Sequence, residues 1–130
     1  LYQVGMTKDI SGLKRYVSID GGMADNIRPA LYQAEYEALL ANKADADDTE
    51  PVTIAGKYCE SGDILIEQIK LPPVTYGDVV AVPVCGAYCL PMASNYNASL
   101  KPAIIVVNEG AARIIRQRDT LQDLIRKDLL

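Results

Sequence analysis

The chain has 130 residues, of which 49% are hydrophobic and 23% charged, and its formal net charge is −4. This length and composition are typical of one globular domain, and the acidic balance provides no basic surface of the kind that nucleic acids and anionic membranes require. Because the sequence contains no histidine, neither a serine–histidine–aspartate triad nor a histidine-bound metal can be built from this chain alone.

The sequence also gives an expectation for the compartment. No apolar run approaches the roughly 20 residues that a membrane-spanning helix needs, and the opening stretch LYQVG lacks the basic and apolar regions of a signal peptide. Three cysteines, an odd number, are typical of reduced thiols. We therefore expect a cytoplasmic protein that binds neither membrane nor nucleic acid. Because the sequence starts without methionine and within a strand-like pattern, we also expect it to be a piece of a longer protein.

The first predicted elements are a strand and a short helix. Residues 13–20, LKRYVSID, place Val17 and Ile19 on one face, as in a half-buried strand, and a glycine pair follows them. Pro29 fits the first turn of a short helix or tight loop that continues to Tyr32.

Four further strands are predicted in the middle of the chain. The acidic stretch 44–50 is predicted to be a loop, and its flanks, 36–42 and 51–57, to be the strands of a long-looped hairpin. Residues 63–71 form a strand pattern that ends before two prolines. Residues 78–84, DVVAVPV, predict a β-branched strand whose proline favours an edge position or a bulge.

The last part of the chain predicts a hairpin and a helix. Residues 103–108 and 111–116 flank the pair EG, which is typical of a hairpin turn. Thr120 and Asp123 approximate a capping box at the start of a C-terminal helix. The sum is seven or eight short strands with short helices. We therefore predict a single domain over residues 1–130 that is mostly β, with a Greek-key or barrel-like arrangement.

The motif DGGMADNIRPALY, residues 20–32, contains a candidate carboxylate clamp. A guanidinium beside a proline-stiffened turn can grip a carboxylate through two parallel hydrogen bonds, and a phenol four residues later adds another contact. Arg28 and Tyr32 are therefore candidate substrate-binding residues. The alternative interpretation is a surface charge and a half-buried rim residue.

The stretch GKYCESGDIL, residues 56–65, places a thiol beside a carboxylate. Because a thiol is mostly protonated near neutral pH, Cys59 is a candidate general acid that gives a proton to a carbanion. Glu60 is a candidate partner for a substrate ammonium, and we expect Gly62 to let the turn close. The alternative interpretation is a buried, inert cysteine in an ordinary turn.

The motif VCGAYCLPMASNYN, residues 84–97, is the third candidate for chemistry. Its Gly-Ala pair permits the close approach of a ligand, and Tyr88 can lie against a planar ring or reach a phosphate. Cys85 and Cys89 alone do not supply the four ligands of a structural zinc site, so we expect no metal.

Together and in this order, DGGMADNIRPALY, CESGD and GAYCLPMASNYN resemble the C-terminal domain of the diaminopimelate decarboxylase family, whose members are fold-type III enzymes that use pyridoxal 5'-phosphate. The closing stretch TLQDLIRKDLL is similar to the end of these enzymes, so the resemblance covers essentially the whole chain. It implies an amino-acid decarboxylase that converts meso-2,6-diaminopimelate to L-lysine and carbon dioxide.

The resemblance implies a role for each candidate residue. Arg28 and Tyr32 match the positions that hold a substrate carboxylate, and Glu60 matches the carboxylate that contacts the far end of the substrate. Cys59 matches the thiol that protonates the carbon left after loss of carbon dioxide, and Tyr88 matches a tyrosine that touches both cofactor and substrate. In the family, the thiol and the carboxylate reach into the partner's site, which implies a homodimer with sites shared across its interface.

The family also implies an N-terminal (β/α)₈ barrel that carries the cofactor's lysine and a glycine-rich phosphate loop, and this sequence contains neither. None of its lysines stands in a matching context. We therefore expect the chain alone to be inactive and to bind pyridoxal phosphate weakly.

Two alternatives stay open at this point. A sister decarboxylase acting on ornithine, arginine or carboxynorspermidine would share the fold and the cofactor. An arginine clamp beside Glu60 favours a far end that carries both an amine and a carboxylate, and hence diaminopimelate, while carboxynorspermidine stays open as a substrate. The other alternative is a non-enzymatic β domain that dimerises or binds a small molecule.

Overall fold

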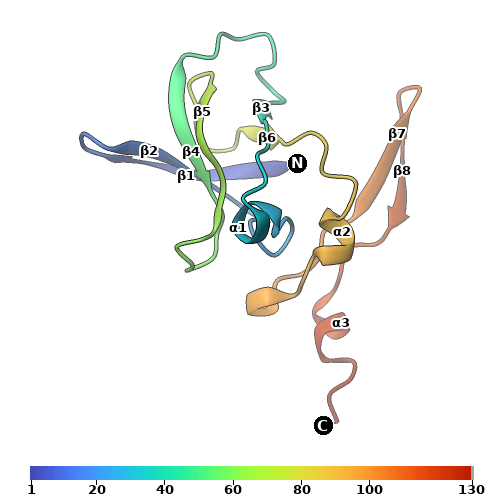
Figure 1. Cartoon of the computed structure of the whole chain (residues 1–130). Coiled ribbons are helices and arrows are strands. Elements are labelled where there is room, and N and C mark those ends of the chain that lie inside the picture. The colour runs from blue at the N-terminus through green and yellow to red at the C-terminus, as the bar shows by residue number, and fades with distance from the viewer. Residues whose placement is uncertain (130) are drawn as a thin grey trace.

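The computed structural model describes residues 1–129, and the fold is mostly β (Figure 1). Leu130, the last residue of the predicted domain, lies outside the described residues. The elements, in chain order, are β1 (Tyr2–Ile10), β2 (Lys14–Ile19), α1 (Arg28–Tyr32), β3 (Leu39–Leu40), β4 (Glu50–Ala55), β5 (Ile64–Leu71), β6 (Val79–Ala81), α2 (Cys89–Met92), the 3₁₀ turn η1 (Tyr96–Ala98), β7 (Ile104–Asn108), β8 (Ala111–Arg116) and α3 (Leu121–Ile125).

Six of the strands form one curved sheet in the order β3-β6-β1-β2-β4-β5 (Figure 1). The pair β2–β4 is parallel, and the other pairs are antiparallel. The short helix α1 packs against β5, one of the two end strands. The predicted mostly-β, barrel-like fold is thus confirmed, and its α1 and C-terminal helix are at the predicted places.

The hydrophobic core lies on the inner face of this sheet. On β2 the predicted face is confirmed, because Val17 and Ile19 are both almost completely buried. Alternation of this kind is what a strand with one solvated face requires. The buried apolar cluster draws on all six strands and the β5–β6 loop: Val4, Val17, Ile19, Leu40, Val52, Ile54, Leu65, Ile66, Leu71, Val74 and Val80.

The predicted hairpin between residues 36–42 and 51–57 is wrong. The short strand β3 pairs with β6, whereas β4 pairs with β2 and β5. The reason lies in the core: Leu40 stands opposite Val80 in the β3–β6 register, and both side chains are buried. Sequence proximity suggested a partner for β3, but the apolar residue that covers it comes from much later in the chain.

The predicted edge position or bulge for residues 78–84 is also wrong. Strand β6 ends at Ala81 and has a partner on each side, β3 and β1. Pro83 therefore follows the strand, where its missing backbone donor interrupts no ladder.

The predicted hairpin and helix near the C-terminus are confirmed. Strands β7 and β8 pair through Glu109 and Gly110, both with positive φ, as a two-residue hairpin turn requires. Thr120 and Asp123 form a complete capping box at the start of α3. In Figure 1 this hairpin and α3 extend away from the six-stranded sheet. Within residues 1–129, no helix has the length and apolar character needed to cross a bilayer.

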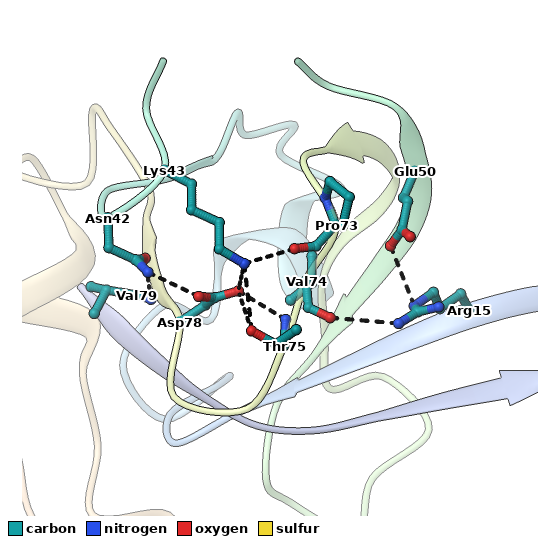
Figure 2. A network of polar contacts seen from close by, with 9 residues as sticks. All are labelled: Arg15, Asn42, Lys43, Glu50, Pro73, Val74, Thr75, Asp78 and Val79. Carbon is teal, nitrogen blue, oxygen red and sulfur yellow. Dashed lines mark hydrogen bonds and ion pairs between the residues drawn. The ribbon is translucent and has the colours of Figure 1, made fainter. Parts of the chain in front are cut away.

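A polar network joins the segment after β3 to the loop between β5 and β6, and Figure 2 shows it with Asp78 at its centre. The Asp78 carboxylate, 4% exposed as a residue, accepts hydrogen bonds from Lys43 Nζ at 2.7 Å, Asn42 Nδ2 at 2.8 Å and the Thr75 backbone N–H at 2.8 Å. Lys43 also donates to the Pro73 carbonyl at 2.8 Å. Burial alone would raise the pKa of Asp78, but the hydrogen bonds from Lys43, Asn42 and Thr75 outweigh it and lower the pKa to about 2.

We predict that Asp78→Asn costs about 2 kcal/mol of stability at pH 7, because the amide cannot pair with the Lys43 ammonium. The wild-type contribution is complete above pH about 4, the ordinary pKa of an aspartate, and disappears as the pH falls through about 2. Thermal midpoints of both proteins between pH 7 and pH 2.5 measure this. The gap between them should narrow on acidification, and a gap that stays constant would contradict the prediction.

Candidate functional site

The structure joins the three predicted motifs, and the first and second meet at Asp63, which follows Gly62 at the end of the CESGD motif. Its side chain is 4% exposed. One carboxylate oxygen accepts the Met23 backbone N–H at 2.7 Å, and the other accepts the Tyr58 backbone N–H at 2.9 Å. The carboxylate therefore joins the first motif to the second motif.

Two glycines make room for this carboxylate. A Cβ atom at Gly22 or at Gly56 would collide with the Asp63 side chain. Gly22 also has a φ of 154°, and Gly56 donates its backbone N–H to the Asp63 carbonyl at 2.8 Å. A second backbone bond, from Lys57 N–H to the Gly21 carbonyl at 2.9 Å, also joins the two motifs. The relative position of the two motifs is thus set by backbone atoms around one buried anion.

The CES turn presents its two candidate residues to solvent. Cys59 and Glu60 are both exposed, and the turn closes through a hydrogen bond of 3.0 Å from the Asp63 N–H to the Glu60 carbonyl. The expectation for Gly62 is wrong, because its φ lies outside the left-handed region and a Cβ there would meet nothing within 4 Å. The alternative of a buried Cys59 is also wrong, because this thiol is exposed.

Arg28 is the first residue of α1, and a hydrogen bond to its backbone N–H holds it in place. The Asn26 side-chain oxygen accepts the Arg28 N–H at 3.3 Å, and Pro29 fixes the first turn as predicted. The guanidinium lies 5.5 Å above the ring of Tyr88 and donates to the Tyr36 hydroxyl at 3.4 Å. The first motif and the third motif therefore meet through a cation–π contact.

Tyr32 and Tyr88 are both available to a ligand. Tyr32 is the last residue of α1 and is 61% exposed, and Tyr88 is 65% exposed. Tyr88 has a φ of 64° and a ψ of −33°, an unusual conformation for a residue with a side chain and one that is typical of functional positions. An exposed flat ring backed by a guanidinium, with a phenol at its end, suits a planar group that carries an anionic substituent.

The two other cysteines lie in the third motif. Burial, and to a lesser extent the neighbouring Cys89, raises the pKa of Cys85 to about 11. The Cys89 sulfur is buried, 3.7 Å from the Tyr36 hydroxyl oxygen. Among residues 1–129, no group of three or more His, Cys, Asp or Glu side chains is arranged to hold a metal ion.

The site residues are displayed on a surface and are not enclosed. A groove of about 620 Å³ lies between β5 and the segment that runs from α1 to Glu37, but Arg28, Cys59, Glu60 and Tyr88 do not line it. What they can do together is grip a carboxylate, pair with an ammonium, offer a thiol proton and support a planar group. A surface of this kind needs a second surface to exclude water from the chemistry.

Sequence reasoning missed the roles of three residues that organise this surface, Asp63, Tyr58 and Tyr96. Asp63 had no assigned role, and its only sequence indication is its place directly before a strand and near two glycine-containing stretches. Tyr96 donates its hydroxyl hydrogen to Glu60 Oε1, and its ring meets that of Tyr58 edge-on with the centroids 5.6 Å apart. No local pattern indicates a contact between residues so far apart in the sequence.

Comparison with known proteins places the chain in a family. The family model described as "Pyridoxal-dependent decarboxylase, C-terminal sheet domain" matches residues 1–86. The diaminopimelate decarboxylase of Bacillus subtilis is 50% identical over 129 residues, which are 99% of this chain and 29% of that protein.

Solved structures give the same result for the fold. The diaminopimelate decarboxylase of M. jannaschii in complex with L-lysine matches with a TM-score of 0.90 and 36% identity, over 99% of this chain and 29% of that one. The Helicobacter pylori enzyme, also in complex with L-lysine, matches with a TM-score of 0.86 and 34% identity, over 96% and 30%. The chain thus spans less than a third of the length of each of these relatives.

The crowding at Asp63 predicts a contrast between two glycines of the same turn. Gly56→Ala should cost about 1 to 3 kcal/mol of stability, because the new methyl group displaces a buried, hydrogen-bonded carboxylate. Gly62→Ala, the matched control, should be neutral or slightly stabilising. Thermal unfolding of the two variants measures the difference, and equal midpoints would show that the Asp63 cradle is not tightly packed.

Proposed function

This chain belongs to the family of pyridoxal-dependent decarboxylases, as their C-terminal sheet domain, and on that premise we propose that the protein containing it decarboxylates meso-2,6-diaminopimelate to L-lysine and carbon dioxide. The observation that supports this most is the grouping of Arg28, Tyr88 and the Cys59–Glu60 turn around one buried junction. Because the chain spans only 29% of the B. subtilis relative, the activity is proposed for the longer protein. We place that protein in the cytoplasm.

Pyridoxal phosphate, when bound, supplies an electron sink for the pair of electrons that departing carbon dioxide leaves behind. We propose that a lysine and a phosphate loop outside this sequence hold the cofactor. From this chain, Tyr88 fits such a group: its ring is 65% exposed and backed by the Arg28 guanidinium, and its hydroxyl suits an anionic substituent. Tyr88 therefore contacts the cofactor and one end of the substrate.

Cys59 is the proposed general acid. The reaction needs a proton at the carbon that has lost its carboxylate, and a protonated thiol can give one without becoming a persistent covalent partner. The exposure of the thiol on a turn supports this role, because the donor has to meet a carbon atom that belongs to another molecule.

Arg28, Tyr32 and Glu60 are the proposed grip on the substrate's unreacting end. In diaminopimelate that end carries both a carboxylate and an ammonium, which suit a guanidinium with a phenol and a carboxylate respectively. Ornithine has only an amine there, so an arginine would have no partner. This difference favours diaminopimelate over ornithine.

The proposed enzyme is a homodimer with shared sites. Cys59 and Glu60 are both exposed on the turn between β4 and β5, and the groove of the same chain does not include them. A second subunit that covers this turn would exclude water from it. The thiol and the carboxylate of this chain would then reach the substrate that the second subunit binds. Arg28 and Tyr88 then serve the site of their own subunit.

The experiment that tests the proposed function is carbon dioxide release by the full-length enzyme with pyridoxal phosphate. Meso-diaminopimelate, ornithine, arginine and carboxynorspermidine are compared at equal concentration. We expect kcat/KM for diaminopimelate to exceed the others by at least tenfold, because each of them leaves Arg28 or Glu60 unpaired. Preference for ornithine, arginine or carboxynorspermidine would reject the proposed substrate and would leave the family assignment unchanged.

For Cys59→Ala in the full-length enzyme, we predict a loss of about 10² to 10⁴ in kcat with little change in KM, because a positioned general acid acts on the transition state. Steady-state carbon dioxide release measures both constants. Cys85→Ala provides the control for losing a thiol elsewhere and should retain near wild-type kcat. An unchanged kcat in Cys59→Ala would remove this thiol from the mechanism.

A further inference from the structure

The Glu60 carboxylate is held by a residue from a distant part of the chain. The Tyr96 hydroxyl donates its hydrogen to Glu60 Oε1, although Glu60 lies on an exposed turn. An exposed glutamate samples many rotamers, and fixing it costs side-chain entropy that a ligand would otherwise have to supply. One hydrogen bond from the protein side leaves Oε2 available for a ligand donor.

Tyr96 is itself fixed in place. Its ring meets the Tyr58 ring edge-on at 5.6 Å with an interplanar angle of 72°, a favoured geometry for aromatic pairs. The Tyr58 hydroxyl donates to Ser99 Oγ at 2.7 Å, and the Tyr96 N–H donates to Ser94 Oγ at 3.3 Å. Tyr96 therefore has little freedom to move away from Glu60.

This support leads back to the same buried junction. Ser94 donates its N–H to the Ala24 carbonyl at 2.9 Å, and the Tyr58 N–H is bound by Asp63 at 2.9 Å. The donor Tyr96 and the acceptor Glu60 are thus both anchored at the junction around Asp63, although they come from different loops. The contact with Glu60 also raises the pKa of Tyr96, which keeps the phenol in its donating form.

We propose that Tyr96 is a positioning residue for Glu60: its hydroxyl bond to Oε1 orients the carboxylate so that Oε2 receives the ammonium at the unreacting end of the amino-acid substrate. This inference rests on the proposed function, in which Glu60 contacts that ammonium. Tyr96 acts through Glu60 and adds to substrate binding without taking part in proton transfer.

The test uses the full-length enzyme with pyridoxal phosphate and the variants Tyr96→Phe, Glu60→Ala and their combination. Tyr96→Phe keeps the ring against Tyr58 and removes only the hydroxyl. It should raise KM for diaminopimelate about three- to tenfold and leave kcat within about twofold. The dissociation constant of L-lysine, measured by calorimetry, should rise by a similar factor, because L-lysine retains the same ammonium and carboxylate.

The double variant decides whether Tyr96 acts through Glu60. In the Glu60→Ala background, Tyr96→Phe should change kcat/KM by less than about twofold, because the partner that it orients is gone. Tyr76→Phe is the matched control: it makes the same chemical change at a residue that is 80% exposed and should leave both constants unchanged. Thermal midpoints of all variants verify that each is folded.

Five outcomes would overturn the inference, and they are distinguishable. If Glu60→Ala impairs binding and Tyr96→Phe does not, or if the two effects multiply in the double variant, Tyr96 does not position Glu60 while the proposed function stands. If Tyr96→Phe lowers kcat alone, its role lies in the chemical step. If the wild-type enzyme releases no carbon dioxide from diaminopimelate, or Glu60→Ala has wild-type kinetics, the proposed role of Glu60 fails and the inference fails with it.

Discussion

The buried carboxylate of Asp63 is the interaction on which the functional surface depends. A carboxylate removed from water is stable only when donors surround it, and here backbone N–H groups of Met23 and Tyr58 serve as donors. Because these groups belong to the backbone, they fix the paths of two separate segments and not merely two side chains. Gly22 and Gly56 are required for a steric reason, since a methyl group at either position would occupy the space of the carboxylate.

Everything proposed for the site is placed relative to this junction. On one side, the segment after Gly22 leads through Asn26 into α1, which presents Arg28 over the ring of Tyr88. On the other side, the turn before Asp63 presents the thiol and the carboxylate of the CES motif. The proposed grip and the proposed proton donor therefore lie on two segments that the same buried carboxylate holds together. Such an arrangement is suited to a pair of sites that two subunits complete for each other.

The C-terminal part of the chain differs from the six-stranded sheet in what determines its structure. The β7–β8 hairpin has the turn chemistry and the α3 cap that its sequence predicts, so its form is locally determined. Its apolar side chains are nevertheless exposed in the described residues, with Val107 72% and Ile105 54% accessible. A lone two-stranded ribbon is marginally stable in water. Apolar exposure of this extent is typical of contact surfaces, and residues 1–129 offer little to cover it.

The sequence by itself determined most of the local elements and the class of fold, and it contains the three motifs from which the site is proposed. The alternation around Val17 and Ile19, the proline at the start of α1, the capping box at Thr120 and the three ordered motifs all act over a few residues, and all are visible in a single chain. The tertiary structure alone decided that β3 pairs with β6, that Asp63 joins two motifs and that Tyr96 reaches Glu60. These contacts join residues far apart in the chain, and they are selected by which apolar faces bury one another and which buried polar groups find partners, a property of the whole fold that no local pattern contains.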